Sequence, residues 1–190
     1  MRVLNDPGGR AKAPEPLRLV QAFVNTVDFE NDVEELTDPA ALEAVLAGLG
    51  VLAADAAPLG PADLERALRV REALRALLLG NNGIDVERAT LDTLEQAARR
   101  GRLVIRFGPA GRAELLSDAA GLDGALGRIV GVIHTAMADG TWRRLKACPR
   151  HICRWVFYDR SKNQSSRWCA MSVCGNRVKT SRYRGRAALS

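Results

Sequence analysis

Apolar residues recur with helical spacing through most of the first 140 residues. The stripes are bounded by helix-start and helix-stop residues: Pro16 suits a first helical position, Asp38 is a favoured N-cap, and glycines follow several stripes. Five helices are predicted, over residues 16–30, 38–50, 60–80, 85–101 and 121–140. The pattern therefore indicates a multihelical region.

Two other segments alternate with the period of a β-strand. Residues 102–116 carry β-branched and aromatic residues before a Gly/Pro turn and apolar residues after it, which predicts a hairpin. In residues 154–159, Trp155 and Phe157 share one face, and after a polar turn residues 167–171 can return as a second strand. A second hairpin, followed by a short helix, is therefore predicted near the end of the sequence.

Charge divides the chain into two parts. Residues 1–140 contain 15 Lys/Arg and 21 Asp/Glu, a balance of −6, whereas residues 141–190 contain 13 Lys/Arg and one acid, Asp159, a balance of +12. Basic tails can serve solubility alone, but this density of cations favours a polyanionic partner.

All four cysteines lie in the basic part, as two pairs of identical spacing: Cys148 with Cys153, and Cys169 with Cys174. A disulfide scaffold, a metal site and a reactive thiol all have to be considered. The sequence shows no secretory signal and no apolar run long enough to span a bilayer, so we expect a cytoplasmic protein, whose thiols stay reduced. Four thiolates suit tetrahedral Zn²⁺, and a segment this small usually needs a metal ion or disulfides to stabilise its fold. We predict one zinc ion per chain, with a redox or catalytic thiol as the alternative.

These patterns together predict a mainly α protein. Residues 1–14 are expected to form a flexible leader, residues 15–140 a multihelical domain with a small β-hairpin, and residues 141–190 a four-cysteine zinc finger, built from a β-hairpin and a short helix, with a basic tail.

The residues around the last cysteine resemble the CGNR zinc finger, named for Cys174-Gly175-Asn176-Arg177. The stretches "CPRHICRWVFYDRS" and "WCAMSVCGNR" carry the resemblance, and upstream "FVNTVDF" and "VREALRALL" are similar to the ABATE domain that accompanies this finger in bacteria. The resemblance implies a stress-responsive transcriptional regulator in which the cysteines hold the metal, the finger binds DNA and the helical domain senses a ligand. One departure is Ser166, where the family often has a basic residue.

Solvent-facing cations and amides near the cysteines are the candidates for contacts with DNA. Asn176 and Arg177 are favoured for reading bases, because each side chain can form paired hydrogen bonds with a base edge. The alternatives are local: Asn176 can cap the turn at the last cysteine, and Arg177 can pair with Asp159. The predicted DNA-binding residues are Arg160, Lys162, Arg167, Asn176, Arg177, Lys179, Arg182 and Arg184.

Polar residues within the apolar runs of the helical region give the sequence's only indication of a small-molecule site. The candidates are Asn25, Thr26, Arg71 and Arg75. Hydrogen bonding to a neighbouring helix is the alternative use of these side chains. No Ser/His/Asp set, phosphate-binding loop or carboxylate pair stands out, so we do not expect an enzyme.

The sequence thus favours a zinc-dependent, DNA-binding transcription regulator that responds to a ligand or to stress through its helical domain. An RNA-binding module is one alternative, because aromatic residues beside arginines also suit single strands. Another is a protein-interaction module whose acidic partner is the chain's own helical domain or a transcription-machinery protein.

Overall fold

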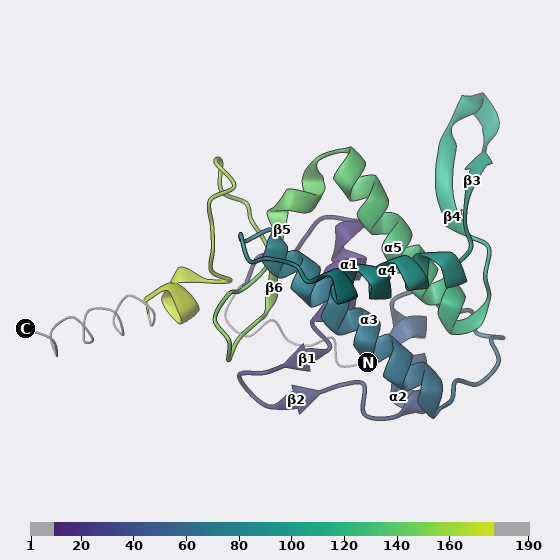
Figure 1. Ribbon diagram of the computed structural model, residues 1–190, viewed down its shortest axis with the longest axis horizontal. Coiled ribbons are helices and arrows are strands. Elements are labelled where there is room, and N and C mark those ends of the chain that lie inside the picture. The colour runs from purple at the N-terminus through teal and green to yellow at the C-terminus, as the bar shows by residue number, and fades with distance from the viewer. Residues whose placement is uncertain (1–9, 177–190) are drawn as a thin grey trace, which may run out of the picture.

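The computed structural model describes residues 10–176 and packs five α-helices against one another (Figure 1). They are α1 Leu17–Val24, α2 Pro39–Gly48, α3 Pro61–Gly80, α4 Arg88–Arg100 and α5 Gly121–Ala138. Each of the five helices predicted before residue 141 is present, whereas the short helix predicted after the last cysteine lies outside the described residues. The Asp38 side chain caps α2 by accepting a hydrogen bond from the Ala41 N–H at 2.8 Å. Within the described part of the chain, no helix combines the length and the apolar character needed to cross a bilayer.

Three small antiparallel sheets, each of two strands, accompany the helices. The pairs are β1 Val27–Asp28 with β2 Val33–Glu34, β3 Leu103–Phe107 with β4 Ala113–Ser117, and β5 Leu145–Ala147 with β6 Val156–Tyr158. The β3–β4 pair confirms the hairpin expected over residues 102–116 and projects from the body of the molecule, with β5 and β6 toward the opposite end (Figure 1). Helix α1 is shorter than predicted because the chain turns after Val24 and enters β1.

The second predicted hairpin is wrong in its pairing. Strand β6 pairs with β5, which precedes the first cysteine, and residues 167–171 form no strand. The 3-10 turn η2, Thr141–Arg144, leads directly into β5, so that the two strands flank the first cysteine pair. The three-residue sequence of β5 is too short to predict a strand. In the structure, Leu145 pairs with Tyr158 and Ala147 pairs with Val156.

Strand β6 is shared between two apolar clusters because its side chains alternate. Val156 is buried in the main core, which is built from the helices together with Trp142, Leu145 and Ala147. Its neighbours Trp155 and Phe157 point to the opposite side and pack with the four cysteines in a second cluster. The alternation predicted from the sequence is therefore confirmed, and β6 packs against the helical core on one side and against the cysteines on the other.

Close approach of α5 to the end of α4 requires a glycine. A Cβ atom placed on Gly127 would lie 2.6 Å from Ser117 Oγ and 2.9 Å from Gly101 Cα. We expect Gly127→Ala to lower the free energy of unfolding by about 1–3 kcal/mol, because the overlap outweighs alanine's higher helix propensity. Gly131→Ala, in the same helix, is the matched control: its Cβ would meet no atom closer than 3.6 Å. Urea unfolding of the two variants checks this, and equal stability would show that α4 and α5 adjust freely.

Candidate metal centre

The four cysteine sulfurs converge on one point although the two pairs are far apart in sequence. All four Sγ atoms lie within 4.8 Å of one another, and the Sγ atoms of Cys153 and Cys169 and of Cys169 and Cys174 are 3.6 Å apart. A tetrahedral ion with Zn–S bonds of about 2.3 Å requires sulfurs separated by roughly 3.8 Å. The cysteines are all buried and unbridged, so their donor set and spacing fit one thiophilic metal ion.

Local hydrogen bonds hold each cysteine pair in a tight turn. The Cys148 N–H donates to the Trp155 carbonyl at 2.9 Å, which extends the β5–β6 ladder, and the Cys153 N–H donates to the Arg150 carbonyl at 2.9 Å. In the second pair, Cys169 precedes a single π-helical turn, η3 Met171–Gly175, and Cys174 lies within it, its N–H donating to the Ala170 carbonyl at 2.9 Å.

Crowding of the thiols disfavours several thiolates at once. The hydrogen bond with Cys153, together with burial, raises the pKa of Cys148 to about 12, and the hydrogen bond with Cys148 and burial raise the pKa of Cys169 to about 12. Burial also opposes ionisation of Cys174, but hydrogen bonds from the Arg150 guanidinium and from the other thiols lower its pKa. A divalent cation stabilises the thiolates that burial and their mutual repulsion disfavour, so metal binding to the cluster displaces protons.

A charged layer that combines Arg150 of the cysteine segment with two residues from far upstream lies beside the cluster. The Arg10 Nε donates to Cys169 Sγ at 3.4 Å and its Nη2 donates to Cys153 Sγ at 3.9 Å. Arg150 Nη1 donates to Cys174 Sγ at 3.8 Å. Glu30, in the turn between β1 and β2, accepts from both guanidinium groups, at 3.3 Å from Arg10 and 3.1 Å from Arg150. Sequence reasoning missed Arg10 and Glu30, because nothing in their local sequence points to cysteines more than a hundred residues away.

A buried ion pair anchors the loop that joins the two cysteine pairs. Lys146 Nζ lies 2.8 Å from Asp159 Oδ2, and both side chains are almost fully buried. Burial alone would raise the pKa of Asp159, but hydrogen bonds from Lys146 and Ser161 lower it to about 2. The interaction therefore adds stability above the unfolded-state pKa of about 4, and this stability is lost as the pH falls toward 2. The sequence had offered Asp159 as a partner for Arg177, but Arg177 lies outside the described residues and Asp159 binds Lys146.

The four predicted effector residues are engaged within the chain. Asn25 pairs with the backbone of Val156 in both directions, donating at 2.9 Å and accepting at 2.8 Å, as a neighbouring strand would. Arg71 forms a two-pronged ion pair with Glu34, at 2.6 and 2.7 Å. Further contacts are Thr26 Oγ1 to the Phe23 carbonyl, Arg71 to Thr26 and to Glu72, and Arg75 to the Val24 and Arg154 carbonyls and to Glu72. These side chains therefore form internal hydrogen bonds, which was the alternative considered from the sequence. Those of Asn25 and Arg75 include bonds to the backbone of the cysteine segment.

Two asparagines at the end of α3 bind the cysteine segment in the same way. Asn81 Nδ2 donates to the Trp142 and Leu145 carbonyls at 3.0 and 2.8 Å, and Asn82 Nδ2 donates to the Ala147 and Arg167 carbonyls at 2.8 and 3.0 Å. Both residues lie in the turn that follows α3, where neither is required to bind another part of the chain. The side chains instead satisfy strand and loop carbonyls that lie more than sixty residues away.

The predicted DNA-binding residues divide by position. Arg160, Lys162 and Arg167 are exposed in the loop between the cysteine pairs, although Arg160 also donates to the Lys12 carbonyl at 3.1 Å. Asn176 is exposed directly after η3, and its backbone N–H donates to the Met171 carbonyl. The other predicted contacts lie outside the described residues: Arg177, Lys179, Arg182 and Arg184.

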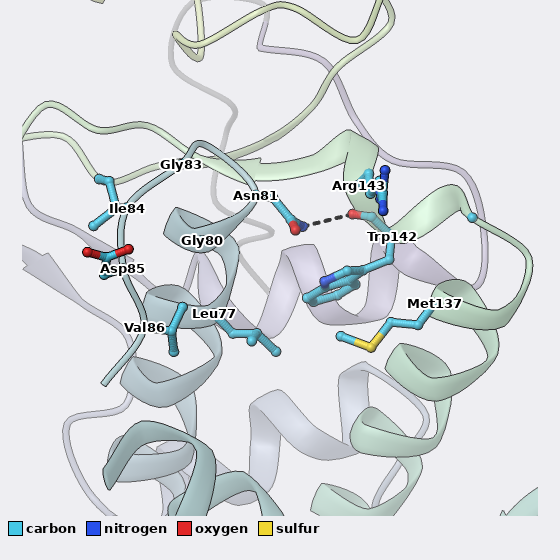
Figure 2. A pocket seen from close by; sticks show the side chains of 11 residues that line it. Leu77, Gly80, Asn81, Gly83, Ile84, Asp85, Val86, Met137, Trp142 and Arg143 are labelled. Carbon is cyan, nitrogen blue, oxygen red and sulfur yellow. Dashed lines mark hydrogen bonds between the residues drawn. The ribbon is translucent and has the colours of Figure 1, made fainter. Parts of the chain in front are cut away.

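An open groove of about 590 Å³ lies beside the cysteine segment, where α3 and α5 end. Figure 2 shows the Trp142 ring between the side chains of Leu77 and Met137, with the Asn81 amide turned toward the Trp142 carbonyl. Arg143 lies at the rim. None of the four predicted effector residues lines this groove.

Comparison with protein families agrees with this arrangement. The model of the CGNR zinc finger matches residues 144–187. The ABATE model, described as a "putative stress-induced transcription regulator", matches residues 17–145. Among curated proteins, none matches the sequence significantly. The two families and their order are those expected from the resemblance of the sequence.

Proposed function

The chain belongs to the ABATE family and carries a CGNR zinc finger, and from this premise we propose that it is a zinc-dependent, DNA-binding transcription regulator rather than an enzyme. The observation that carries the proposal is the convergence of four buried thiols inside a segment with 13 basic residues and one acid. Metal, in this proposal, supplies the shape of the finger, and the exposed cations face the phosphates.

The structure supports this proposal by separating structural cations from exposed ones. Lys146 binds the Asp159 carboxylate, and Arg144 donates to the backbone carbonyls of Asp159 and Ser161. Asp159, the only acid of residues 141–190, is thereby neutralised. The exposed charged side chains between Cys153 and Cys169 are all cations, Lys162 and Arg167 among them, and such a loop suits a polyanion.

Salt dependence of DNA binding tests the proposal. For the metal-loaded protein on a random-sequence duplex, we expect a log–log slope of about −3.5 to −5.5, as for roughly 4–6 phosphate contacts. Lys162→Gln and Arg167→Gln should each reduce its magnitude by about 0.9 if the side chain contacts a phosphate. Fluorescence anisotropy over a salt series measures the slopes.

Arg99→Gln provides the matched control, since this arginine is 81% exposed but lies on α4 in the helical region. It should leave the slope unchanged. A flat salt response of the unmodified protein, or equal effects of the loop and α4 substitutions, would contradict binding of DNA through the finger.

Competition distinguishes the RNA-binding alternative. Single-stranded RNA is bound by stacking on exposed aromatic side chains, whereas Trp155 and Phe157 are buried against the cysteines. We therefore expect duplex DNA to displace the labelled duplex at lower concentration than single-stranded RNA of equal length. The opposite order would favour the RNA-binding module.

We place the effector response of this regulator at the groove of Figure 2 rather than at the four polar residues suggested by sequence. Those residues have their hydrogen bonds satisfied inside the chain, as described above. The groove offers an apolar wall of Leu77, Met137 and Trp142. Asn81 also lines the groove and binds the backbone at the start of β5, so an occupant would touch the connection to the finger.

A further inference from the structure

A layer of three charged side chains, drawn from three parts of the chain, lies beside the cysteine cluster, and its two arginines donate hydrogen bonds to the sulfurs. Arg10 and Arg150 together reach three of the four sulfurs, and Glu30 bridges the two guanidinium groups. Arg10 is only 4% exposed and lies outside both family matches, and its guanidinium carbon is 5.0 Å from the centre of the Trp155 ring.

Burial of Arg10 demands negative charge. A buried guanidinium is costly unless anionic partners compensate it, and its Nη1 has no hydrogen-bond partner among the described residues. Glu30 supplies one negative charge, which it shares with Arg150. Four neutral thiols supply none, whereas four thiolates around a divalent ion carry a net charge of −2. The positions of the two arginines are therefore suited to a metal-bound, anionic cluster.

We propose that Arg10, Glu30 and Arg150 are positioning residues of the metal centre, and that they make metal binding depend on the docking of the amino-terminal part of the chain onto the finger. Arg10 arrives on the segment that runs along β6, where the Tyr158 N–H donates to the Ala11 carbonyl at 3.0 Å. Glu30 arrives on the β1–β2 turn. The two groups come from the amino-terminal side of the chain, and the sulfurs come from its carboxy-terminal side, so neither part contains the complete site.

The physical effect expected of this layer is on the strength and the electronic character of the metal–sulfur bonds. Hydrogen bonds from partners around the ligands hold each thiolate in place and stabilise its charge, and loss of such partners typically weakens metal binding 10- to 100-fold. Arg10→Ala removes donors to two sulfurs, and Glu30→Gln weakens the bridge that orients both arginines.

Zinc transfer from the full-length loaded protein to a chromophoric chelator tests the proposal. We expect Arg10→Ala to weaken zinc binding by about 10- to 100-fold and Glu30→Gln to weaken it in the same direction by a smaller factor. In the cobalt-substituted protein, the sulfur-to-metal charge-transfer bands should shift in Arg10→Ala, because the thiolates lose hydrogen bonds; a purely structural role would leave them unchanged. Arg10→Lys, which keeps the charge but not the guanidinium fork, should restore only part of the affinity.

Arg18→Ala is the matched control, since this arginine is close in sequence but lies partly exposed on α1, with its nearest acidic partner at 4.0 Å. It should transfer zinc at the unmodified rate. Transfer and cobalt spectra unchanged in both Arg10→Ala and Glu30→Gln would overturn the proposal. It rests on the metal site of the proposed function, and the two can fail separately: an unmodified protein that takes up no zinc removes both, whereas tight zinc binding that is indifferent to Arg10 and Glu30 removes only this one.

Discussion

Cys169→Ser is expected to abolish stoichiometric metal binding and to unfold the finger. The sulfur of Cys169 lies 3.6 Å from those of both Cys153 and Cys174 and accepts a hydrogen bond from Arg10. Structural zinc contributes on the order of 10–16 kcal/mol in zinc-finger peptides, and the second apolar cluster has few other residues to replace it. After chelator treatment, the zinc content should be about one ion per chain in the unmodified protein and near zero in Cys169→Ser. The near-ultraviolet circular dichroism of Trp155, packed against the cysteines, should be lost with the metal.

Ile152→Ser introduces the same residue beside Cys153 without touching the cluster, because Ile152 is 41% exposed. This control should retain its metal and its aromatic signal. Full metal retention by Cys169→Ser, or a disulfide protecting the four cysteines in the purified protein, would contradict a four-thiolate site.

Lys146→Met is expected to be the most destabilising substitution of a single charged residue in the finger. Removing one member of a buried ion pair leaves the other charged and without its counter-ion, at a cost of about 3–5 kcal/mol. Here the residual charge is Asp159, which is 1% exposed. Lys146 Nζ also donates to the Gln164 and Ser166 carbonyls, at 2.6 and 3.1 Å, so the loop between the cysteine pairs loses its anchor as well. Urea unfolding of the metal-loaded protein measures the loss.

Lys162→Met removes an equal charge from the neighbouring loop surface and should change stability by no more than about 0.5 kcal/mol, since Lys162 is exposed. If Lys146→Met cost no more than this control, the buried pair would not be what holds the loop in place.

Features that could be predicted from the sequence depend on local patterns. Asp38 caps α2 because its side chain reaches a backbone N–H three residues ahead, and the alternation of Trp155, Val156 and Phe157 reflects the geometry of a strand. The cysteine set follows from spacing, because two close pairs separated by a loop can meet around one ion.

Features that could not be predicted depend on contacts between distant residues. The Arg10–Cys169 hydrogen bond spans 159 positions, and the bond from Asn82 to the Ala147 carbonyl spans 65. A side chain that binds a backbone carbonyl leaves no hydrophobic period and no motif in the sequence. The misassigned hairpin has the same origin: β5 contains Lys146, whose strand character comes from its buried partner Asp159 rather than from its own propensity.

Because β6 packs in two cores, the finger is not expected to fold when it is transferred alone to another protein. Grafted onto another protein, residues 141–190 would bring Val156 and Leu145 to the surface and would leave the Val156 backbone without the amide of Asn25. The smallest transferable unit extends back through α1 and the segment that carries Arg10. Fusions and truncations that cut the chain at the boundary between the two families would therefore divide a single folding unit.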